Sequence, residues 1–562
     1  MKNTFYLSIL SAGLFMFSCE PEIQDIPEPT SGTADFSTYV ALGNSLTAGY
    51  VDNALYLEGQ LNSYPSIIAD QFMEAGGGEF VQPLVPEGNG INGSGQGRLE
   101  LTIQNGSPVP VSTTGDPSIF TSAPTVDGPY NNLGVPGARS FHLVAPGYGS
   151  SQGNPFFARF ATSGTTTVVA DAAAQNPTFF TLWIGNNDIL GYALAGGDGD
   201  EITPVSNFTQ AMQGVVGTLV AANSDIEGAI ANIPDILEIP YFTTVPYNAF
   251  ALSADQAAAA NAGLAAQIEP VVEETVITTV VSATAVAQEA VYTQAFQQAK
   301  SQGASDQEAA EAANNYINTP QGQIEIGAVR DQILGNLEAT GLDEPLATLV
   351  LSTNTLIDNP NIRPAAVQAQ IDGLLANPEQ RPNDLQNEID SQIQGLRDAG
   401  FYPTLVEGAN GFLISDENSP TTLRLATEND LILLDVASLS PEVIAAGPLE
   451  DGLVLTSDEI AQIDAARNAY NNVISGLASD NGFAFVDVAA LFDNLVQGGI
   501  FVDGETFTSE FVLGNAFSLD GVHLTPAGAA VVANTFISAI NAQYNSEVSP
   551  VNVSSYRGNI LP

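Results

Sequence analysis

Residues 41–50 read ALGNSLTAGY and join a short β-rich apolar run to the loop that follows it. Gly43, Asn44 and Gly49 are ordinary turn residues, so Ser45 could simply lie in a tight turn. The other interpretation makes Ser45 a nucleophile at the end of a buried strand. Because a serine hydroxyl is a weak nucleophile at neutral pH, this interpretation requires a histidine base and a carboxylate that orients it.

Five short β-rich apolar runs alternate with segments whose apolar residues recur at helical spacing. The runs are Tyr39–Leu42, Tyr130–Val135, Phe179–Ile184, Ala229–Ile233 and Phe483–Val488. This alternation predicts the α/β class, with a parallel sheet covered by helices on both faces. Functional sites in such sheets form outside the carboxyl ends of the strands, and Ser45 lies at that end of the first run.

Histidine is scarce in this chain, which contains two. His523 lies in SLDGVHLTPAG, three residues after Asp520 and ahead of a helix predicted over residues 527–542. On so short a loop the carboxylate can meet the imidazole Nδ1 and leave Nε2 free for a serine. A capping aspartate followed by an exposed histidine would explain the same residues, so the pair alone leaves both interpretations open. His142, the second histidine, is interpreted as a loop residue without a catalytic role.

Four stretches, in the same order along the chain, resemble the sequence blocks of the SGNH or GDSL hydrolases. They are GNSLTAGY (43–50), NNLGVPGARS (131–140), WIGNNDIL (183–190) and DGVH (520–523). Asn44 stands where the first block usually has aspartate. The resemblance covers residues 37–252 and 405–545. It implies a three-layer α/β/α, flavodoxin-like SGNH fold, interrupted here by a large helical insertion.

The same resemblance implies roles for individual residues. Ser45 would be the nucleophile, His523 its base and Asp520 the acid that orients the histidine. The backbone N–H of Gly137 and the side-chain amide of Asn187 would hold the oxyanion, together with the N–H of Ser45. The implied reaction is hydrolysis of a carboxylic ester through an acyl-enzyme, with no metal or organic cofactor.

Three functions stay open at the level of sequence. The first is an esterase or lipase that acts on acyl lipids, and the second is a polysaccharide deacetylase-type carbohydrate esterase that acts on acetylated glycans. The third is a surface lipoprotein that keeps the fold and binds glycan without catalysis. The G-x-S-x-G motif of other serine hydrolases does not fit, because Thr47 stands where that motif needs glycine.

The charge of the chain is strongly one-sided. Its 562 residues include 12 Lys and Arg against 63 Asp and Glu, a formal net charge of −51. Such a surface repels phosphate backbones, so nucleic acid is not expected as a partner. The acidic loop with Asp198, Asp200 and Glu201 is interpreted as solvated, because it is too short for an EF-hand calcium loop. The Gly-rich residues 85–97 lack the following helix that a dinucleotide fingerprint needs, and we expect a flexible surface loop there.

The N-terminus has the pattern of a processing segment. After Lys2, an apolar run over residues 5–17 is too short to span a bilayer and ends just before Cys19, the single cysteine. Cys19 resembles the lipid-bearing cysteine of a bacterial lipoprotein, and the acidic residues after it resemble surface-export signals of Bacteroidetes lipoproteins. We therefore expect a signal peptide over residues 1–18, a lipid-anchored acidic tether over 19–36 and an outer-membrane location facing the cell surface. No other apolar run is long enough to be a membrane span, so membrane contact would be through the lipid anchor only.

The remaining domain organisation follows from composition. Residues 253–404 change to Ala, Gln, Asn and Glu with apolar residues at helical spacing, which predicts a helical insertion. Capping-box patterns at Ser253 with Gln256 and at Ser305 with Glu308 predict two of its helix starts. The insertion would divide a hydrolase domain into residues 37–252 and 405–545, and residues 546–562 would form a C-terminal tail.

Overall fold

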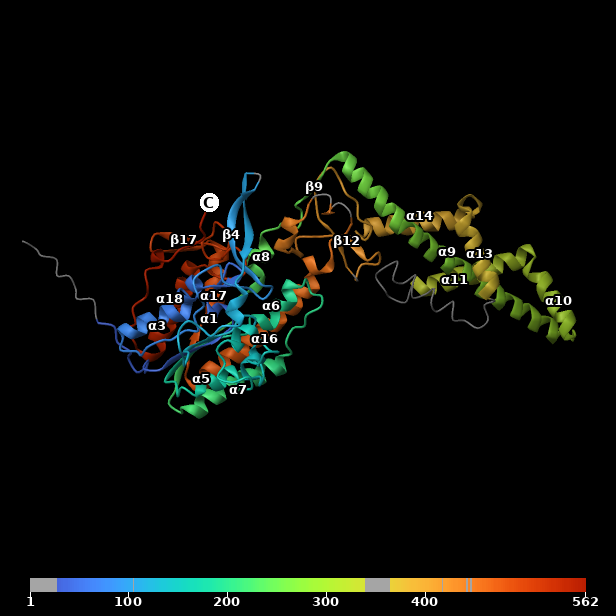
Figure 1. The fold of residues 1–562 in the computed structure, drawn as a ribbon. Coiled ribbons are helices and arrows are strands. Elements are labelled where there is room, and N and C mark those ends of the chain that lie inside the picture. Colours follow the sequence, from blue (N-terminus) through green and yellow to red (C-terminus); the bar gives the residue numbers. More distant parts are fainter. Residues whose placement is uncertain (1–27, 105, 339–363, 417, 441–442, 445–446) are drawn as a thin grey trace, which may run out of the picture.

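The five β-rich runs form one sheet in the computed structural model (Figure 1). From one edge to the other its strands are β15 (Ala484–Val486), β8 (Glu227–Ala231), β7 (Phe179–Trp183), β1 (Tyr39–Gly43) and β6 (Asn132–Gly134). Every neighbouring pair is parallel, which confirms the predicted α/β class and its parallel sheet. Read from β6 and numbered in chain order, the strand order is 2-1-3-4-5. The structure describes residues 28–104, 106–338, 364–416, 418–440, 443–444 and 447–562.

The central strands are buried along their whole length. Every residue of β1 (YVALG) and of β7 (FFTLW) is buried. A strand covered on both faces has no solvent side, so its sequence is continuously apolar instead of alternating. This is the physical reason why these strands were recognisable as short apolar runs.

Two groups of helices pack against the sheet. One group contains α3 (Tyr64–Glu74), α17 (Val488–Gln497) and α18 (Pro526–Tyr544), and the other contains α5 (Val168–Ala173), α7 (Val205–Ala222) and α16 (Ser457–Asn481). Within each group the helices contact one another, and both α16 and α18 contact β8 and β15. Helix α18 extends the segment predicted over residues 527–542 by one or two residues at each end.

An aromatic cluster fixes α3 and α18 to the sheet. Trp183 at the end of β7 lies edge-on to Tyr64, with ring centroids 5.6 Å apart. Tyr64 in turn stacks on Phe536 of α18 at 4.9 Å. At the other end of α18, the hydroxyl of Tyr544 donates to the carbonyl of Gly228 in β8 at 2.8 Å. These contacts position α18, which begins directly after the loop that carries His523.

Short elements surround the carboxyl edge of the sheet. They are α1 (Ser45–Ala48), β2 (Tyr50–Val51), β3 (Ala54–Leu55), α2 (Leu57–Leu61), α4 (Pro155–Ala158), α6 (Asn187–Leu194), α8 (Pro240–Thr243), β16 (Ile500–Val502) and β17 (Glu505–Phe507). Strands β4 (Gln96–Gln104) and β5 (Ser107–Thr114) form an antiparallel hairpin that projects from this part of the molecule (Figure 1). The Gly-rich residues 85–97 lead into β4, and no helix follows their glycines.

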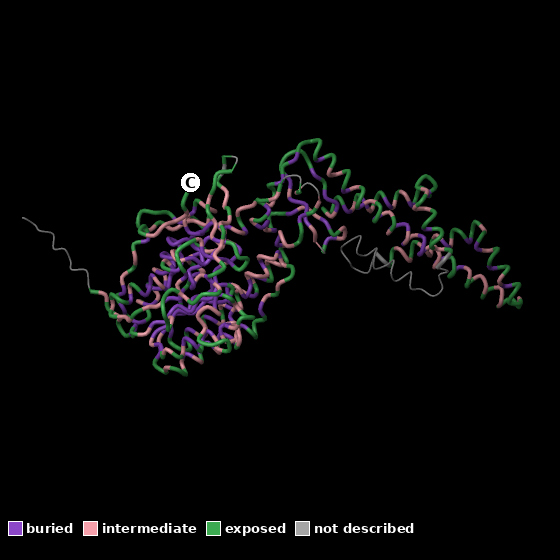
Figure 2. Tube along the Cα trace, in the orientation of Figure 1, coloured by how far each residue is buried: buried purple, intermediate pink, exposed green. Residues whose placement is uncertain are grey.

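The helical segment extends away from the sheet as an arm (Figure 1). Its helices are α9 (Ala254–Ser301), α10 (Asp306–Ile317), α11 (Pro320–Glu338), α13 (Pro364–Ala376) and α14 (Asn383–Asp398). The capping boxes predicted at Ser253 and Ser305 are confirmed, because each serine hydroxyl accepts from the N–H three residues later. Figure 2 shows that buried residues concentrate around the sheet, whereas much of the arm is exposed or partly buried.

A second apolar core joins the arm to the residues that follow it. It contains Leu264, Ile268 and Val272 of α9, Leu385 and Ile389 of α14, and further side chains as far as Val454. Small antiparallel pairs belong to this region: β9 (Phe250–Leu252) with β10 (Gly408–Asn410), β11 (Leu413–Ser415) with β12 (Leu423–Leu425), and β13 (Leu431–Ile432) with β14 (Val454–Leu455). The core thus spans the boundary expected at residues 404 and 405, and packing associates most of residues 405–454 with the arm.

One segment corrects an expectation about membranes. Helix α9 is long and apolar enough to cross a bilayer by length and composition, and half of its most apolar window is buried inside the protein. By length and composition alone, the expectation that no other apolar run is long enough to be a membrane span was therefore wrong. Apolar residues of α9 pack in the second core. Over part of its length, a helix buried in this way has the same apolar composition as a helix that spans a membrane.

The structure describes the C-terminal end of the chain but not residues 1–27. The predicted signal peptide, Cys19 and the first part of the tether lie outside the described residues. Residues 546–562 pack against the sheet-bearing part, since Val548 and Val553 are buried. Arg557 in this segment pairs with Glu58 of α2 through a 2.5 Å contact from Nε to Oε1.

The aromatic cluster generates a stability prediction. Phe536→Ala should lower the free energy of unfolding by roughly 3–5 kcal/mol, because the ring is fully buried against Tyr64 and the site cannot collapse around the cavity. Urea unfolding followed by the fluorescence of Trp183, the single tryptophan, measures this loss. Phe501→Ala removes a ring that is 75% exposed, so this control should change the free energy of unfolding by less than about 0.5 kcal/mol. Equal losses in the two variants would contradict the assignment of Phe536 to the core.

Candidate active site

Ser45 lies at the first position of α1, directly beyond the carboxyl end of β1. The side chain of Asn44 caps this short helix by accepting from the N–H of Leu46 at 3.0 Å. A Cβ on Gly43 would overlap the Thr47 hydroxyl and the Trp183 carbonyl, so only glycine lets the chain turn this tightly. The side-chain oxygen of Asn44 thus supplies the cap that an aspartate would also supply at this turn.

Three side chains from distant parts of the sequence form a hydrogen-bonded relay. Nε2 of His523 lies 2.9 Å from Oγ of Ser45, although 478 residues separate them. Nδ1 of the same imidazole lies 2.8 Å from Oδ2 of Asp520. With the proton on Nδ1 donated to the carboxylate, Nε2 is left to accept the proton of the serine hydroxyl. This is the arrangement that activates a serine nucleophile.

The Asp520 carboxylate is held by four further donors. Oδ1 accepts from the N–H groups of Val522 and His523, both at 2.9 Å, and from the hydroxyl of Ser518 at 3.0 Å. Oδ2 also accepts from the N–H of Asn53 at 2.8 Å. Burial by itself raises the pKa of Asp520, but the His523 charge and the hydrogen bonds outweigh it, so the pKa lies well below its ordinary value. The carboxylate is therefore ionised and ready to stabilise an imidazolium.

Three N–H groups on residues that line the cleft with Ser45 are without an acceptor among the described residues. The backbone N–H groups of Ser45 and Gly137 have no acceptor among the described residues. The side-chain amide of Asn187 donates one hydrogen to the carbonyl of Ala138 at 2.9 Å, which leaves its second hydrogen unused within the described chain. Ser45, Gly137 and Asn187 all line the same cleft. The sequence-predicted residues Ser45, Gly137, Asn187, Asp520 and His523 are thus brought together in one place.

A buried carboxylate with no role in the sequence prediction joins the loops that carry Gly137 and Asn187. Asp188 is fully buried and accepts from both the N–H and the hydroxyl of Ser140, at 2.8 and 2.6 Å. Its neighbour Asn187 and the preceding loop with Gly137 are thereby fixed relative to each other. The signal for this contact was present in the sequence, since Asp188 ends the GNND stretch, but its partner could not be inferred from spacing.

His142 lies apart from the relay. Its Nδ1 accepts from the backbone N–H of Arg139 at 3.0 Å, and its ring stacks on Tyr148 with centroids 4.4 Å apart. Burial and the neighbouring Arg139 lower the pKa of His142 to about 4, so the ring is neutral at pH 7. His142 is not one of the described residues that line the cleft around Ser45.

The acidic loop pairs with a nearby arginine. The carboxylate of Asp200 forms an ion pair with Arg139, and the carbonyl of Glu201 accepts from the same guanidinium at 3.0 Å. Within the described part of the chain, no group of three or more His, Cys, Asp or Glu side chains is arranged to hold a metal ion.

A large cleft opens above Ser45. Its volume is about 1040 Å³, and most of the side chains along its walls are apolar. The β4–β5 hairpin contributes Leu99 and Val109, and α6 contributes Leu190. Other apolar lining residues are Pro108, Pro110, Phe156, Leu194, Leu434, Phe511, Leu519 and Val522. Such a cleft fits an extended apolar ligand group whose reacting end lies at the serine.

Comparison of the sequence with protein-family models gave no match, and neither did comparison with curated proteins or with solved structures. The functional assignment therefore depends on the geometry of the site.

The contact between Asp188 and Ser140 generates a second stability prediction. Asp188→Ala should lower the free energy of unfolding by roughly 2–4 kcal/mol, because it leaves two buried donors of Ser140 without an acceptor. Asp200→Ala is the matched control, since Asp200 is partly exposed and its ion pair with Arg139 should contribute about 1 kcal/mol or less. Unfolding by urea, followed by tryptophan fluorescence, compares the two. If Asp188→Ala lowers the free energy of unfolding no more than Asp200→Ala does, Asp188 has no role in joining the loops.

Proposed function

We propose that this chain is a serine ester hydrolase of the SGNH type. The observation that carries the proposal is the relay from Asp520 through His523 to Ser45, with distances of 2.8 and 2.9 Å, beside a large cleft. A buried carboxylate, an imidazole and a serine in this order form the constellation that generates a nucleophilic alkoxide in unrelated hydrolases. Three N–H donors near the same serine supply the second requirement of acyl transfer.

The fold supports the proposal independently of the side chains. The strand order 2-1-3-4-5 is that of flavodoxin-like sheets, in which sites lie outside the carboxyl ends of the strands. The two groups of helices that contact the sheet fit the three-layer α/β/α arrangement that the resemblance implies. Four sequence blocks that resemble the SGNH hydrolases contribute the loops of one site.

The proposed mechanism begins with attack of Ser45 Oγ on the ester carbonyl carbon. His523 Nε2 takes the hydroxyl proton, and the carbonyl electron pair moves onto oxygen. When the tetrahedral intermediate collapses, the bond to the alcohol oxygen breaks and His523 gives its proton to that oxygen. Water, deprotonated by His523, then attacks the acyl-Ser45 ester, and the acid leaves as Ser45 regains its proton.

The oxyanion donors supply much of the rate enhancement in this mechanism. Negative charge develops on the carbonyl oxygen only as the transition state forms, so donors already fixed toward that position bind it more strongly than the substrate. Loss of one such donor typically costs about 3 kcal/mol of transition-state stabilisation. The Asp188–Ser140 contact is what keeps Asn187 and Gly137 in place for this purpose.

The cleft favours acyl esters over acetylated glycans as substrates. Sugar hydroxyls require a high density of hydrogen-bonding groups, whereas most of the side chains that line the cleft are apolar, Leu99, Val109 and Leu190 among them. Each methylene of an acyl chain that leaves water against such walls contributes about 0.8 kcal/mol. We therefore assign medium- to long-chain carboxylic esters as substrates. Lipid anchoring through Cys19 and an outer-membrane, surface-facing location belong to the same proposal and would place the cleft near acyl lipids.

The non-catalytic alternative makes a different prediction about Ser45. A glycan-binding protein on this fold has no need of a serine within hydrogen-bond distance of an imidazole. Labelling of native protein by a fluorophosphonate probe separates the two functions, because the probe reacts covalently only with an activated serine. Protein that stays unlabelled would favour the binding function.

The relay generates a prediction for three point variants. Ser45→Ala and His523→Ala should each reduce hydrolysis of p-nitrophenyl butyrate by at least about a thousandfold, because the nucleophile or its base is lost. His142→Ala is the matched control and should keep most of the activity, since this ring lies apart from the relay. Steady-state kinetics on purified protein measure all three. Full activity in Ser45→Ala would exclude the mechanism.

The cleft generates a prediction about acyl length. The test compares kcat/KM across p-nitrophenyl acetate, butyrate, octanoate and palmitate. It should rise at least tenfold from acetate to octanoate, because burial of only two or three of the added methylenes contributes about 2 kcal/mol. Release of acetate from acetylated xylan should be slow by comparison. The reverse ranking, with acetate and acetylated xylan preferred, would favour the carbohydrate esterase.

A further inference from the structure

A two-residue turn beside the nucleophile holds the loop that carries Asp520. Asp52 and Asn53 connect β2 to β3, and both have left-handed backbone angles, with φ of 51° and 59°. This turn type matches the twist of the two strands, and Asp and Asn are, with glycine, the residues that adopt it most readily. Three of the hydrogen bonds that the turn makes go to the loop of residues 518–520.

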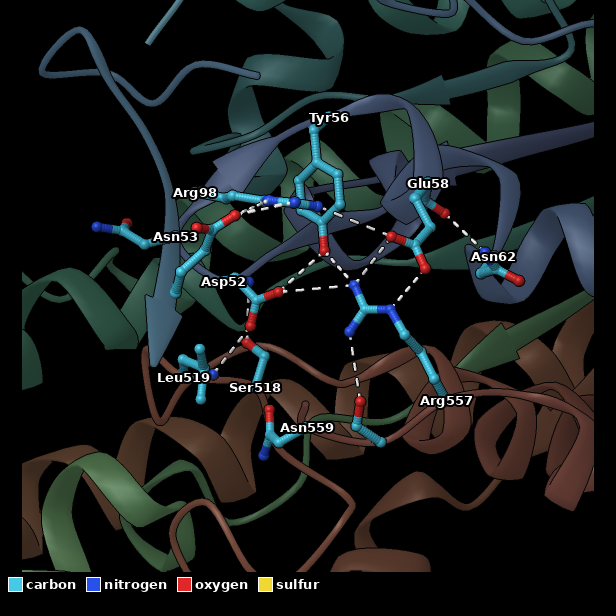
Figure 3. A network of polar contacts seen from close by, with 12 residues as sticks. Asp52, Asn53, Tyr56, Glu58, Asn62, Arg98, Ser518, Leu519, Arg557 and Asn559 are labelled. Atoms are coloured by element: carbon cyan, nitrogen blue, oxygen red, sulfur yellow. Dashed lines mark hydrogen bonds and ion pairs between the residues drawn. The ribbon is translucent and has the colours of Figure 1, made fainter. Parts of the chain in front are cut away.

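Three hydrogen bonds join the turn to the loop, and Figure 3 shows how Asp52 lies against Ser518 and Leu519. The N–H of Asn53 donates directly to Oδ2 of Asp520 at 2.8 Å, and the N–H of Asp52 donates to the hydroxyl of Ser518 at 3.1 Å. That hydroxyl in turn donates to Oδ1 of Asp520 at 3.0 Å. In the opposite direction, Oδ1 of Asp52 accepts from the N–H of Leu519 at 3.1 Å. The turn thus fixes both oxygens of the carboxylate that orients His523.

The other oxygen of the Asp52 carboxylate is tied to the C-terminal segment (Figure 3). Oδ2 accepts from the hydroxyl of Tyr56 at 2.9 Å and lies 3.9 Å from Nη2 of Arg557. The same Nη2 donates to the Tyr56 hydroxyl at 2.8 Å, and Nε donates to Glu58 at 2.5 Å. Arg557 therefore reaches the turn from the segment expected to be a tail.

The charges around Asp52 favour an arginine at this place. Asp52 is 4% exposed, and its carboxylate interacts with that of Asp520. Burial and the charge of Asp520 raise the pKa of Asp52, while Leu519, Tyr56 and Arg557 oppose this rise. The guanidinium of Arg557, 3.9 Å from Oδ2 of Asp52 and paired with Glu58, contributes positive charge beside these carboxylates.

We infer that Asp52, held by Arg557, is a positioning residue for the Asp520–His523 pair, and that the C-terminal segment is therefore part of the catalytic apparatus. The inference rests on the proposed ester hydrolysis. Asp52 does not occur among the described cleft-lining residues, so it acts through Asp520 and not through the substrate. Its loss should reduce kcat with little effect on KM, because misalignment of the relay weakens proton transfer but leaves the cleft walls in place.

The test uses the full chain and p-nitrophenyl butyrate. Asp52→Asn and Arg557→Gln should each lower kcat by about 10- to 100-fold while KM stays within about threefold. The rate at which a fluorophosphonate labels Ser45 should fall in parallel. Arg557→Lys keeps the positive charge near Asp52 but loses the fork that reaches Tyr56 and Glu58, so its kcat should lie between those of wild type and Arg557→Gln.

Asp171→Asn is the matched control for loss of a buried carboxylate. Asp171 is 8% exposed and holds a loop by accepting from the N–H of Thr162 at 3.0 Å and the hydroxyl of Thr166 at 2.7 Å. These partners have no contact with the relay among the described residues. Asp171→Asn should lower the unfolding midpoint about as much as Asp52→Asn but leave kcat within twofold of wild type.

Each outcome decides the inference. If wild type is active and Asp52→Asn keeps kcat within threefold, or if Asp171→Asn loses as much kcat, Asp52 has no positioning role. If Asp52→Asn does not fold, Arg557→Gln gives the answer, and unchanged kcat in that variant overturns the inference. If wild type neither hydrolyses the ester nor reacts with the probe, the proposed function has failed and the inference fails with it.

Discussion

Parallel pairing of the five strands is the constraint on which the site depends. Because parallel strands all end at the same edge of a sheet, the loops after β1, β6 and β7 meet there although about 140 residues of sequence lie between the first and the last. The register places Gly43 beside both Gly134 and Trp183, so all three loops leave the sheet at one level. The relay then needs only one more loop, ahead of α18, to be complete.

Polar contacts between these loops fix their positions relative to one another. Asn132 donates to the carbonyl of Thr47 at 2.9 Å, which ties β6 to α1. Asp188 and Ser140 tie the loops that carry Asn187 and Gly137, and the Asp52–Asn53 turn ties the loop after β1 to Asp520. Most of these residues are buried, so an unmade hydrogen bond would be costly and the loops have few alternative positions.

Some features of the fold and site could be read from the sequence because they leave local patterns. A strand buried on both faces is continuously apolar, which is why β1, β7 and β8 were recognisable. Two histidines in the whole chain, one of them three residues after Asp520, made the base easy to find. The Asp52–Arg557 contact left no such pattern, because 505 positions separate its partners. Strands of two or three residues, such as β13 and β14, are too short to show a period, so their packing with the arm was missed.

The antiparallel pair β9 and β10 has a consequence for the connectivity of the chain. It joins Leu252 to Gly408, so the chain leaves for the arm and returns from it through two adjacent strands. The entropy of closing such a loop grows only logarithmically with its length, by about 0.6 kcal/mol for each doubling. The arm can therefore gain or lose helical residues at little cost to the sheet.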